Sequence, residues 1–124
     1  MKPIEGNLAL VKYLEAIGIS QYWGVNGGGI FNIVKYLSPI QFCNITEYIC
    51  GYAPIGYYLG SGKVGASIVT TGAAEKIVGC GATDARFLNI PALYILPLNN
   101  HTAEAKYPLQ DVSPAGMSIL KQYQ

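Results

Sequence analysis

Apolar runs of strand length alternate with segments of helical period, and this alternation restricts the possible folds more than any other feature of the chain. Strands are predicted at residues 22–25, 41–45, 64–69 and 93–96. A crossover segment separates each strand from the next, so the strands are expected to be parallel with right-handed connections. Parallel sheets are buried on both faces, which fits such continuous apolar runs. The predicted fold class is α/β, a three-layer α/β/α architecture with a mostly parallel sheet.

The segments between the strands have helical spacing. The first helix is expected at residues 8–17, with Asn7 as its N-cap and Gly18 as its stop. Further helices are predicted at about residues 30–37, 47–59 and 74–85, the third of these four helices kinked by Pro54. After Pro97 the pattern weakens into a loop, and residues 117–120 start another element.

Charged residues are scarce for a chain of this length. The 124 residues are enough for one domain; 51% are hydrophobic and only 12% are charged, against a usual charged share of about 25%. The mean hydropathy is +0.28. A small monomer of this composition would expose large apolar patches, which mark interfaces. Other chains, or the rest of a longer chain, are therefore expected to cover much of the surface.

Several classes of partner are disfavoured. The net charge is +1 and no basic run follows a phosphate backbone, so nucleic acid is not expected. The sequence has no 18-residue apolar stretch and no signal-peptide core, so no membrane segment is expected. The cysteines Cys43, Cys50 and Cys80 lack metal or redox spacing and are interpreted as small buried hydrophobes in a reducing cytoplasm.

Glu47 is the leading catalytic candidate. It follows the apolar run at 41–45 and falls where the next helix begins, at the carboxyl edge of a parallel sheet, where α/β proteins bind ligands. An ordinary explanation competes, because glutamate is common in the first turn of helices. The three consecutive glycines Gly27, Gly28 and Gly29 form a second candidate, because one glycine would be enough for a simple turn.

Other motifs are interpreted as structural. Residues 60–65 match a dinucleotide-binding fingerprint as text, but they end a helix and open a strand, the reverse of what that motif needs. His101 is the only histidine and is expected in a solvated loop, and no metal site is predicted. Asp84 and Arg86 are interpreted as a helix-end pair.

The order of the motifs resembles a known family. Gly24-Val25-Asn26-Gly27-Gly28-Gly29-Ile30 is followed by Glu47, Gly62-Lys63-Val64-Gly65, Val69-Thr70-Thr71-Gly72, Asp84-Ala85 and Ile90-Pro91. The set is similar to the N-terminal pyrimidine-binding (PYR) domain of thiamine-diphosphate-dependent enzymes, in the group of acetolactate synthase, pyruvate oxidase and 2-oxo acid decarboxylases. The resemblance covers about residues 6–113, which makes the chain a single PYR domain over residues 1–124, with its last strand and helix expected to be missing.

The resemblance implies roles for particular residues. Glu47 would hydrogen-bond N1′ of the cofactor's aminopyrimidine and so promote loss of the thiazolium C2 proton. A carboxylate in a dry site can share a proton with a ring nitrogen, because desolvation raises its pKa. Gly27, Gly28, Thr71 and Gly72 would contact the cofactor. Gly28, Gly29 and Gln110 would lie near the substrate.

The chain also departs from the family pattern. Ala73-Ala74-Glu75-Lys76-Ile77 replaces the usual Pro-Gly-Ala-Thr-Asn and puts two charges near the expected subunit contact. Asn26 replaces a customary proline. The Gly-Asp-Gly motif that binds diphosphate and Mg²⁺ in the family is missing from this sequence. The expected partner is therefore a diphosphate-binding (PP) domain or subunit, in a homo- or hetero-oligomer, a dimer or tetramer.

The resemblance implies a lyase or transferase that decarboxylates a 2-oxo acid, acetolactate synthase-like or like the two-subunit sulfopyruvate and phosphonopyruvate decarboxylases. Its cofactors would be thiamine diphosphate and partner-bound Mg²⁺. One alternative is a non-catalytic subunit or remnant that keeps the PYR fold for assembly, which the altered stretch at 73–77 favours. Another is a flavodoxin-like nucleotide-binding module, which depends on the fold alone.

Overall fold

The computed structural model describes residues 5–100, 110–113 and 119–123, and its sheet has four strands, all parallel. The strands are β1 (Tyr22–Val25), β2 (Phe42–Asn44), β3 (Ala66–Val69) and β4 (Leu93–Ile95), in the spatial order β2-β1-β3-β4. All four lie inside the predicted runs and match or shorten them. The parallel pairing confirms the predicted α/β class.

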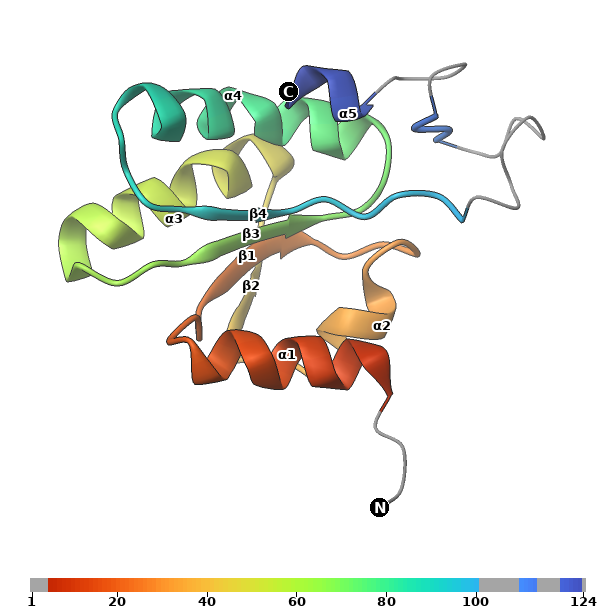
Figure 1. The fold of residues 1–124 in the computed structure, drawn as a ribbon, viewed down its shortest axis with the longest axis horizontal. Helices are drawn as coiled ribbons and strands as arrows, with labels where there is room; N and C mark the ends of the chain where they lie inside the picture. The colour runs from red at the N-terminus through yellow and green to blue at the C-terminus, as the bar shows by residue number, and fades with distance from the viewer. Residues whose placement is uncertain (1–4, 101–109, 114–118, 124) are drawn as a thin grey trace.

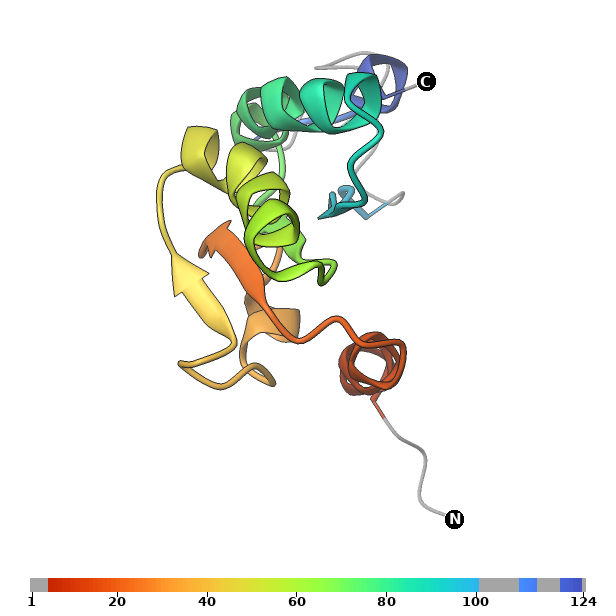
Figure 2. The same cartoon turned by 90° about the vertical axis from the view of Figure 1, so that its left-hand side faces the viewer.

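Helices cover both faces of the sheet. They are α1 (Gly6–Ala16), α2 (Phe31–Val34), α3 (Glu47–Ser61), α4 (Ala73–Phe87) and the short α5 (Ile119–Gln122). Figure 1 shows α1 and α2 below the sheet and α3 and α4 above it, with α5 beside α4. The view in Figure 2 shows the same separation into layers. The three-layer arrangement is therefore confirmed.

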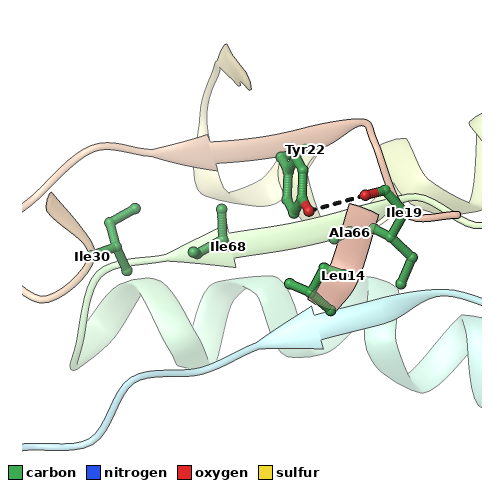
Figure 3. Packing of buried hydrophobic residues seen from close by; sticks show 6 residues of the cluster. All are labelled: Leu14, Ile19, Tyr22, Ile30, Ala66 and Ile68. Atoms are coloured by element: carbon green, nitrogen blue, oxygen red, sulfur yellow. Dashed lines mark hydrogen bonds between the residues drawn. The ribbon is translucent and has the colours of Figure 1, made fainter. Parts of the chain in front are cut away.

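One core cluster lies between the sheet and the α1–α2 layer (Figure 3). Alternate strand residues point to this face, because successive side chains of a strand point to opposite sides. The buried members of the cluster are Leu14, Ile19, Tyr22, Ile30, Ala66 and Ile68. Tyr22 brings a hydroxyl into this apolar layer, and the hydroxyl donates a 3.1 Å hydrogen bond to the carbonyl oxygen of Ile19. Its polar group is thereby satisfied.

The second cluster fills the opposite face, between the sheet and α3 and α4. Its buried members are Cys50, Val69, Ala74 and Val78. The two helices also approach each other closely through glycines. A Cβ atom added to Gly81 of α4 would lie 1.9 Å from the carbonyl oxygen of Gly51 in α3. Only residues without a side chain allow this contact, so these glycines set the spacing between α3 and α4.

Three local expectations were wrong. Asn7 lies inside α1 and is not its N-cap; Glu5 occupies that position, without a side-chain cap bond. The strand predicted as buried, β2, is an edge strand with Cys43 and Asn44 exposed. Of the three cysteines only Cys50 is buried, because Cys43 lies on that edge and Cys80 lies on an exposed position of α4. All three are free thiols.

The helix boundaries follow local signals. α2 is shorter than predicted, because the chain to Leu37 continues in i→i−3 turns such as Leu37 N–H to Val34 O, 2.9 Å. α3 continues through Pro54 to Ser61 and ends at Gly62, which has φ +70° and a left-handed conformation. The fingerprint-like segment 60–65 therefore ends a helix and leads into β3, as predicted. The predicted kink at Pro54 stays a prediction.

Candidate functional site at the carboxyl edge of the sheet

The strand order contains a topological switch point between β1 and β3. From β1 the chain moves outward to β2 and then returns to place β3 on the other side of β1. The connections after β1 and β3 consequently leave toward opposite faces, to α2 and α4 (Figure 1). In open parallel sheets ligands bind at such a point, outside the carboxyl ends of the strands. A ligand is thus expected to bind beside the segments that follow β1 and β3.

The glycine segment after β1 packs directly on the segment after β3. A Cβ added to Gly27 would lie 2.7 Å from the Cβ atom of Thr70, and one added to Gly29 would lie 3.2 Å from the Thr71 backbone nitrogen. The Gly29 amide donates a 3.3 Å hydrogen bond to the Thr70 hydroxyl. A Cβ at Gly28, in contrast, would meet no atom within 4 Å. Gly27 and Gly29 are therefore explained by packing within the chain, whereas Gly28 is not.

Gly72, Thr71 and Gln110 form the other side of this site. Gly72 adopts φ +88° and ψ −129°, a conformation that L side chains rarely adopt, and a Cβ there would lie 2.5 Å from the Cβ atom of Gln110. The Thr71 hydroxyl donates a 3.3 Å hydrogen bond to the Gln110 side-chain oxygen. Gln110 itself has φ +58°, which is uncommon for a non-glycine residue and concentrates at functional sites.

Glu47 opens α3 directly after β2, the strand that neighbours β1 at the sheet edge. The ends of β1 and β2 are joined by a 3.2 Å hydrogen bond from the Asn26 amide to the Asn44 side-chain oxygen. Glu47 is half-buried. Its charge contributes, after burial, to raising the pKa of the Cys50 thiol to about 12. The glutamate thus lies at the same edge as the glycine segment, with part of its side chain still in solvent.

Glu75 is the residue that sequence reasoning missed. Its side chain is completely buried in the first turn of α4. One carboxyl oxygen, Oε2, accepts a 3.0 Å hydrogen bond from the Gly72 amide, while Oε1 has no partner. Burial raises the pKa of Glu75 to about 7, against a smaller lowering by the Gly72 amide. A glutamate three residues after an N-cap is a known helix-start pattern, and this signal could have identified it.

Glu75 and Lys76, the two charged residues expected near a subunit contact, differ in their exposure to solvent. Glu75 adds no surface charge because it points into the chain, whereas Lys76 is exposed. The side chain of Glu75 accepts the hydrogen bond of the Gly72 amide and so contacts the Thr71–Gly72 turn, which the sequence predicts as part of the site. The altered stretch at 73–77 thus has a structural role in this chain, as the cap of α4.

Stability should fall as the pH rises from about 4.5 to about 7. Glu75 binds its proton more tightly in the folded chain, where its pKa is about 7, than in the unfolded chain, where it keeps its ordinary value of 4.5. The free energy of unfolding should therefore drop across this window, by on the order of 3 kcal/mol, and level off above it. Urea titrations at several pH values measure this slope. Glu75→Gln should flatten it, and an unchanged slope in that variant would contradict the assignment.

The structure brings most of the predicted site residues together. Gly27 and Gly29 pack on Thr70 and Thr71, and Gln110 packs on Thr71 and Gly72. Glu47 and Gly28 lie on the same edge of the sheet, and a Cβ added at Gly28 would meet no atom within 4 Å. His101 lies outside the described residues, so its predicted loop position is not tested.

The described part of the chain holds neither a cluster of metal ligands nor a membrane-spanning helix. Within residues 5–100, 110–113 and 119–123, no group of three or more His, Cys, Asp or Glu side chains could hold a metal ion. No helix in the same part is long and apolar enough to cross a membrane.

Comparisons with known proteins do not assign the chain to a family. No model of a known protein family matches it, and no curated protein matches it at a significant level. The class supported by the structure is an α/β protein whose parallel sheet has a topological switch point between β1 and β3.

Proposed function

We propose that this chain is the pyrimidine-binding half of a thiamine-diphosphate-dependent enzyme that decarboxylates a 2-oxo acid. The observation that carries the proposal is the convergence at one sheet edge. The glycine segment follows β1, Glu47 follows β2, and the Thr71–Gly72 turn follows β3. These three of the motifs behind the resemblance are far apart in the sequence, yet each of them follows a strand at the carboxyl edge of the sheet.

The residues at this edge fit the pyrimidine end of the cofactor. An aminopyrimidine ring offers nitrogen donors and acceptors and a flat apolar face. Glu47 supplies a carboxylate for a ring nitrogen, and the open backbone at Gly28 allows a ring system to approach closely. The described residues do not fit the diphosphate–Mg²⁺ end, because they offer no cluster of acidic ligands. That end would be held by a PP domain or subunit, as the resemblance implies.

When bound, thiamine diphosphate supplies a carbon nucleophile that adds to the substrate carbonyl and accepts the electrons released as CO₂ leaves. The chain's own contribution is narrower. Glu47 would hold or share one proton with the pyrimidine nitrogen. The Gly27–Gly29 backbone would line the reacting centre and leave room for the substrate. Protonation of the fragment left after CO₂ release would make the enzyme a decarboxylase, and transfer of that fragment to a second carbonyl would make it a synthase.

An apolar partner surface would complete the site. Tyr48 and Ile49, the residues directly after Glu47, are 58% and 46% exposed, and Phe31, just after the glycine segment, is 57% exposed. Exposed apolar side chains beside a half-buried carboxylate favour a subunit contact here. Covering them would also remove water from Glu47, which strengthens its hydrogen bond to a ring nitrogen. The proposal therefore includes a dimer or tetramer with the site at the subunit contact.

Blocking the open position at Gly28 tests the proposal. Gly28→Val has space within the chain, so the free energy of unfolding should change by no more than about 0.5 kcal/mol. A ligand that approaches this backbone would meet the new side chain. The affinity for thiamine diphosphate with Mg²⁺ should fall at least about tenfold in calorimetric titrations of the protein isolated with its natural partner chains, a loss of about 1.4 kcal/mol or more.

The matched control is Gly60→Val near the end of α3, where a Cβ also meets no atom within 4 Å. This variant should bind the cofactor like the wild type. Equal affinities of Gly28→Val and wild type would contradict a cofactor beside the glycine segment. A wild-type protein that binds no thiamine diphosphate would favour the alternative, a PYR-fold subunit that serves assembly only.

A further inference from the structure

Glu75 and Gly72 hold each other through two hydrogen bonds. The Gly72 amide donates to Glu75 Oε2 at 3.0 Å, and the Glu75 amide donates to the Gly72 carbonyl oxygen at 3.1 Å. The second carboxyl oxygen, Oε1, is buried without a partner in the described structure. A buried carboxyl group with one bonded and one unbonded oxygen has two accessible forms, because a proton on Oε1 removes the uncompensated charge.

Gly72 is in contact, directly or through Thr71, with Gln110 and Gly29 of the candidate site. Gly72 is held in its unusual conformation next to Gln110, and its neighbour Thr71 donates a hydrogen bond to the same glutamine. Thr71 is in turn in contact with Gly29. A change in how firmly the Gly72 amide is held is therefore expected to affect both Gln110 and the glycine segment at the switch point.

We infer that Glu75 is a positioning residue for this site: its carboxyl group fixes the Thr71–Gly72 turn, and gain or loss of one proton changes how firmly the turn is held. The charged form accepts the Gly72 hydrogen bond more strongly than the neutral form, because charge-assisted bonds are about twice as strong as neutral ones. The site should therefore bind an aminopyrimidine more tightly when Glu75 is charged. The ligand part of this inference rests on the proposed function.

Four other ionisable groups lie near Glu75 or near the turn that it holds: Tyr123, Cys80, Asp111 and Lys76. Tyr123 donates its hydroxyl to the Glu75 backbone oxygen, and burial, followed by the charge of Glu75, raises its pKa to about 12, so it stays neutral near pH 7. Cys80 lies further along α4, and its charge makes a smaller contribution to raising the pKa of Tyr123. On the segment that packs against Gly72, Asp111 accepts a 3.0 Å hydrogen bond from the Ser113 amide. Lys76 is exposed to solvent.

The experiment has a ligand-free arm and a ligand arm. In the first, the backbone amide resonance of Gly72 is followed by NMR from pH 5 to pH 8.5 in the protein without added cofactor. It should move through one transition near pH 7 in the wild type and in Glu15→Gln, a control that removes an exposed carboxylate on α1, and it should not move in Glu75→Gln. A wild-type Gly72 resonance with no transition in this range would overturn the inference, whatever the cofactor does.

In the second arm, thiamine diphosphate with Mg²⁺ is titrated into the assembled protein at pH 6 and pH 8. The wild type and Glu15→Gln should bind about fivefold more tightly at pH 8, as expected for a stronger hydrogen bond to the turn. Glu75→Gln should show at most a small part of this change. An identical pH dependence in Glu75→Gln and the wild type would overturn the positioning role. Failure of the wild type to bind at either pH would instead overturn the proposed function, while the Gly72 titration would still report on the turn.

Discussion

For the proposed decarboxylation of a 2-oxo acid, Glu47→Gln is expected to lower kcat by at least about a hundredfold, the usual range for loss of a positioned proton-transfer group. Glutamine keeps the size and hydrogen-bonding capacity of the side chain but cannot hold or release the proton that a pyrimidine nitrogen shares with it. The loss should appear in kcat more than in thiamine diphosphate affinity. Steady-state CO₂ release by the protein assembled with its natural partner chains, measured over a range of thiamine diphosphate concentrations, gives both kcat and the apparent affinity for the cofactor.

Glu15→Gln is the control for this measurement. Glu15 is an exposed carboxylate on α1, bonded through Oε1 to the Gln41 amide at 2.7 Å and remote from the carboxyl edge. Its replacement should leave kcat unchanged. A Glu47→Gln enzyme with wild-type kcat would show that the glutamate at this position is only a first-turn helix residue, the ordinary explanation that its sequence position leaves open.

Gly81→Ala is expected to destabilise the fold by about 3 kcal/mol or more, although alanine usually favours a helix. The new Cβ would stand 1.9 Å from the Gly51 oxygen, 2.1 Å from its carbonyl carbon and 2.7 Å from its Cα atom. All three are backbone atoms of α3, so no side-chain rotation relieves the clash and the two helices must separate. Urea denaturation followed by circular dichroism measures the loss.

Gly56→Ala is the matched control, the same change on an exposed position of α3 where a Cβ meets no atom within 4 Å. There alanine should stabilise the chain by about 0.5–1 kcal/mol, because glycine has the greater entropy to lose on folding. The two variants should thus shift the denaturation midpoint in opposite directions. Stabilisation by Gly81→Ala would mean that α3 and α4 do not pack through their glycines.

The glycine contact also matters for the site. α3 begins at Glu47, four residues before Gly51, and α4 begins just after Gly72, with Gly81 further along it. The distance at which α3 and α4 pack therefore helps to set where Glu47 and the Thr71–Gly72 turn lie relative to each other. In a three-layer fold of this kind, packing on one face of the sheet positions residues at its edge.

The sequence predicted the elements more reliably than their surroundings. Apolar periodicity located each strand and helix among the described residues, because that signal is local. It could not show that β2 lies at the sheet edge and exposes Cys43, since strand order depends on how crossovers pack. The prediction of Asn7 as the N-cap failed for a different reason. Neighbouring residues compete for the N-cap position, and the helix begins at Gly6, one residue before Asn7.

The site could be predicted in part. Gly27, Gly29, Thr71 and Gly72 were selected as motifs, and parallel strands place such motifs at one edge. Glu75 was missed as a site residue because its burial is a tertiary property. The sequence of residues 73–77 does not show that the Glu75 side chain is buried while the neighbouring Lys76 side chain is exposed.

The central claim is that Glu47 lies against a pyrimidine nitrogen and shares a proton with it. Thiamine diphosphate labelled with ¹⁵N at N1′, bound to the assembled protein, reports on this directly by NMR. The N1′ resonance of the wild-type complex should lie toward the position of the protonated ring, and in Glu47→Gln it should return toward that of the free cofactor. An N1′ resonance at the same position in both complexes would contradict the account.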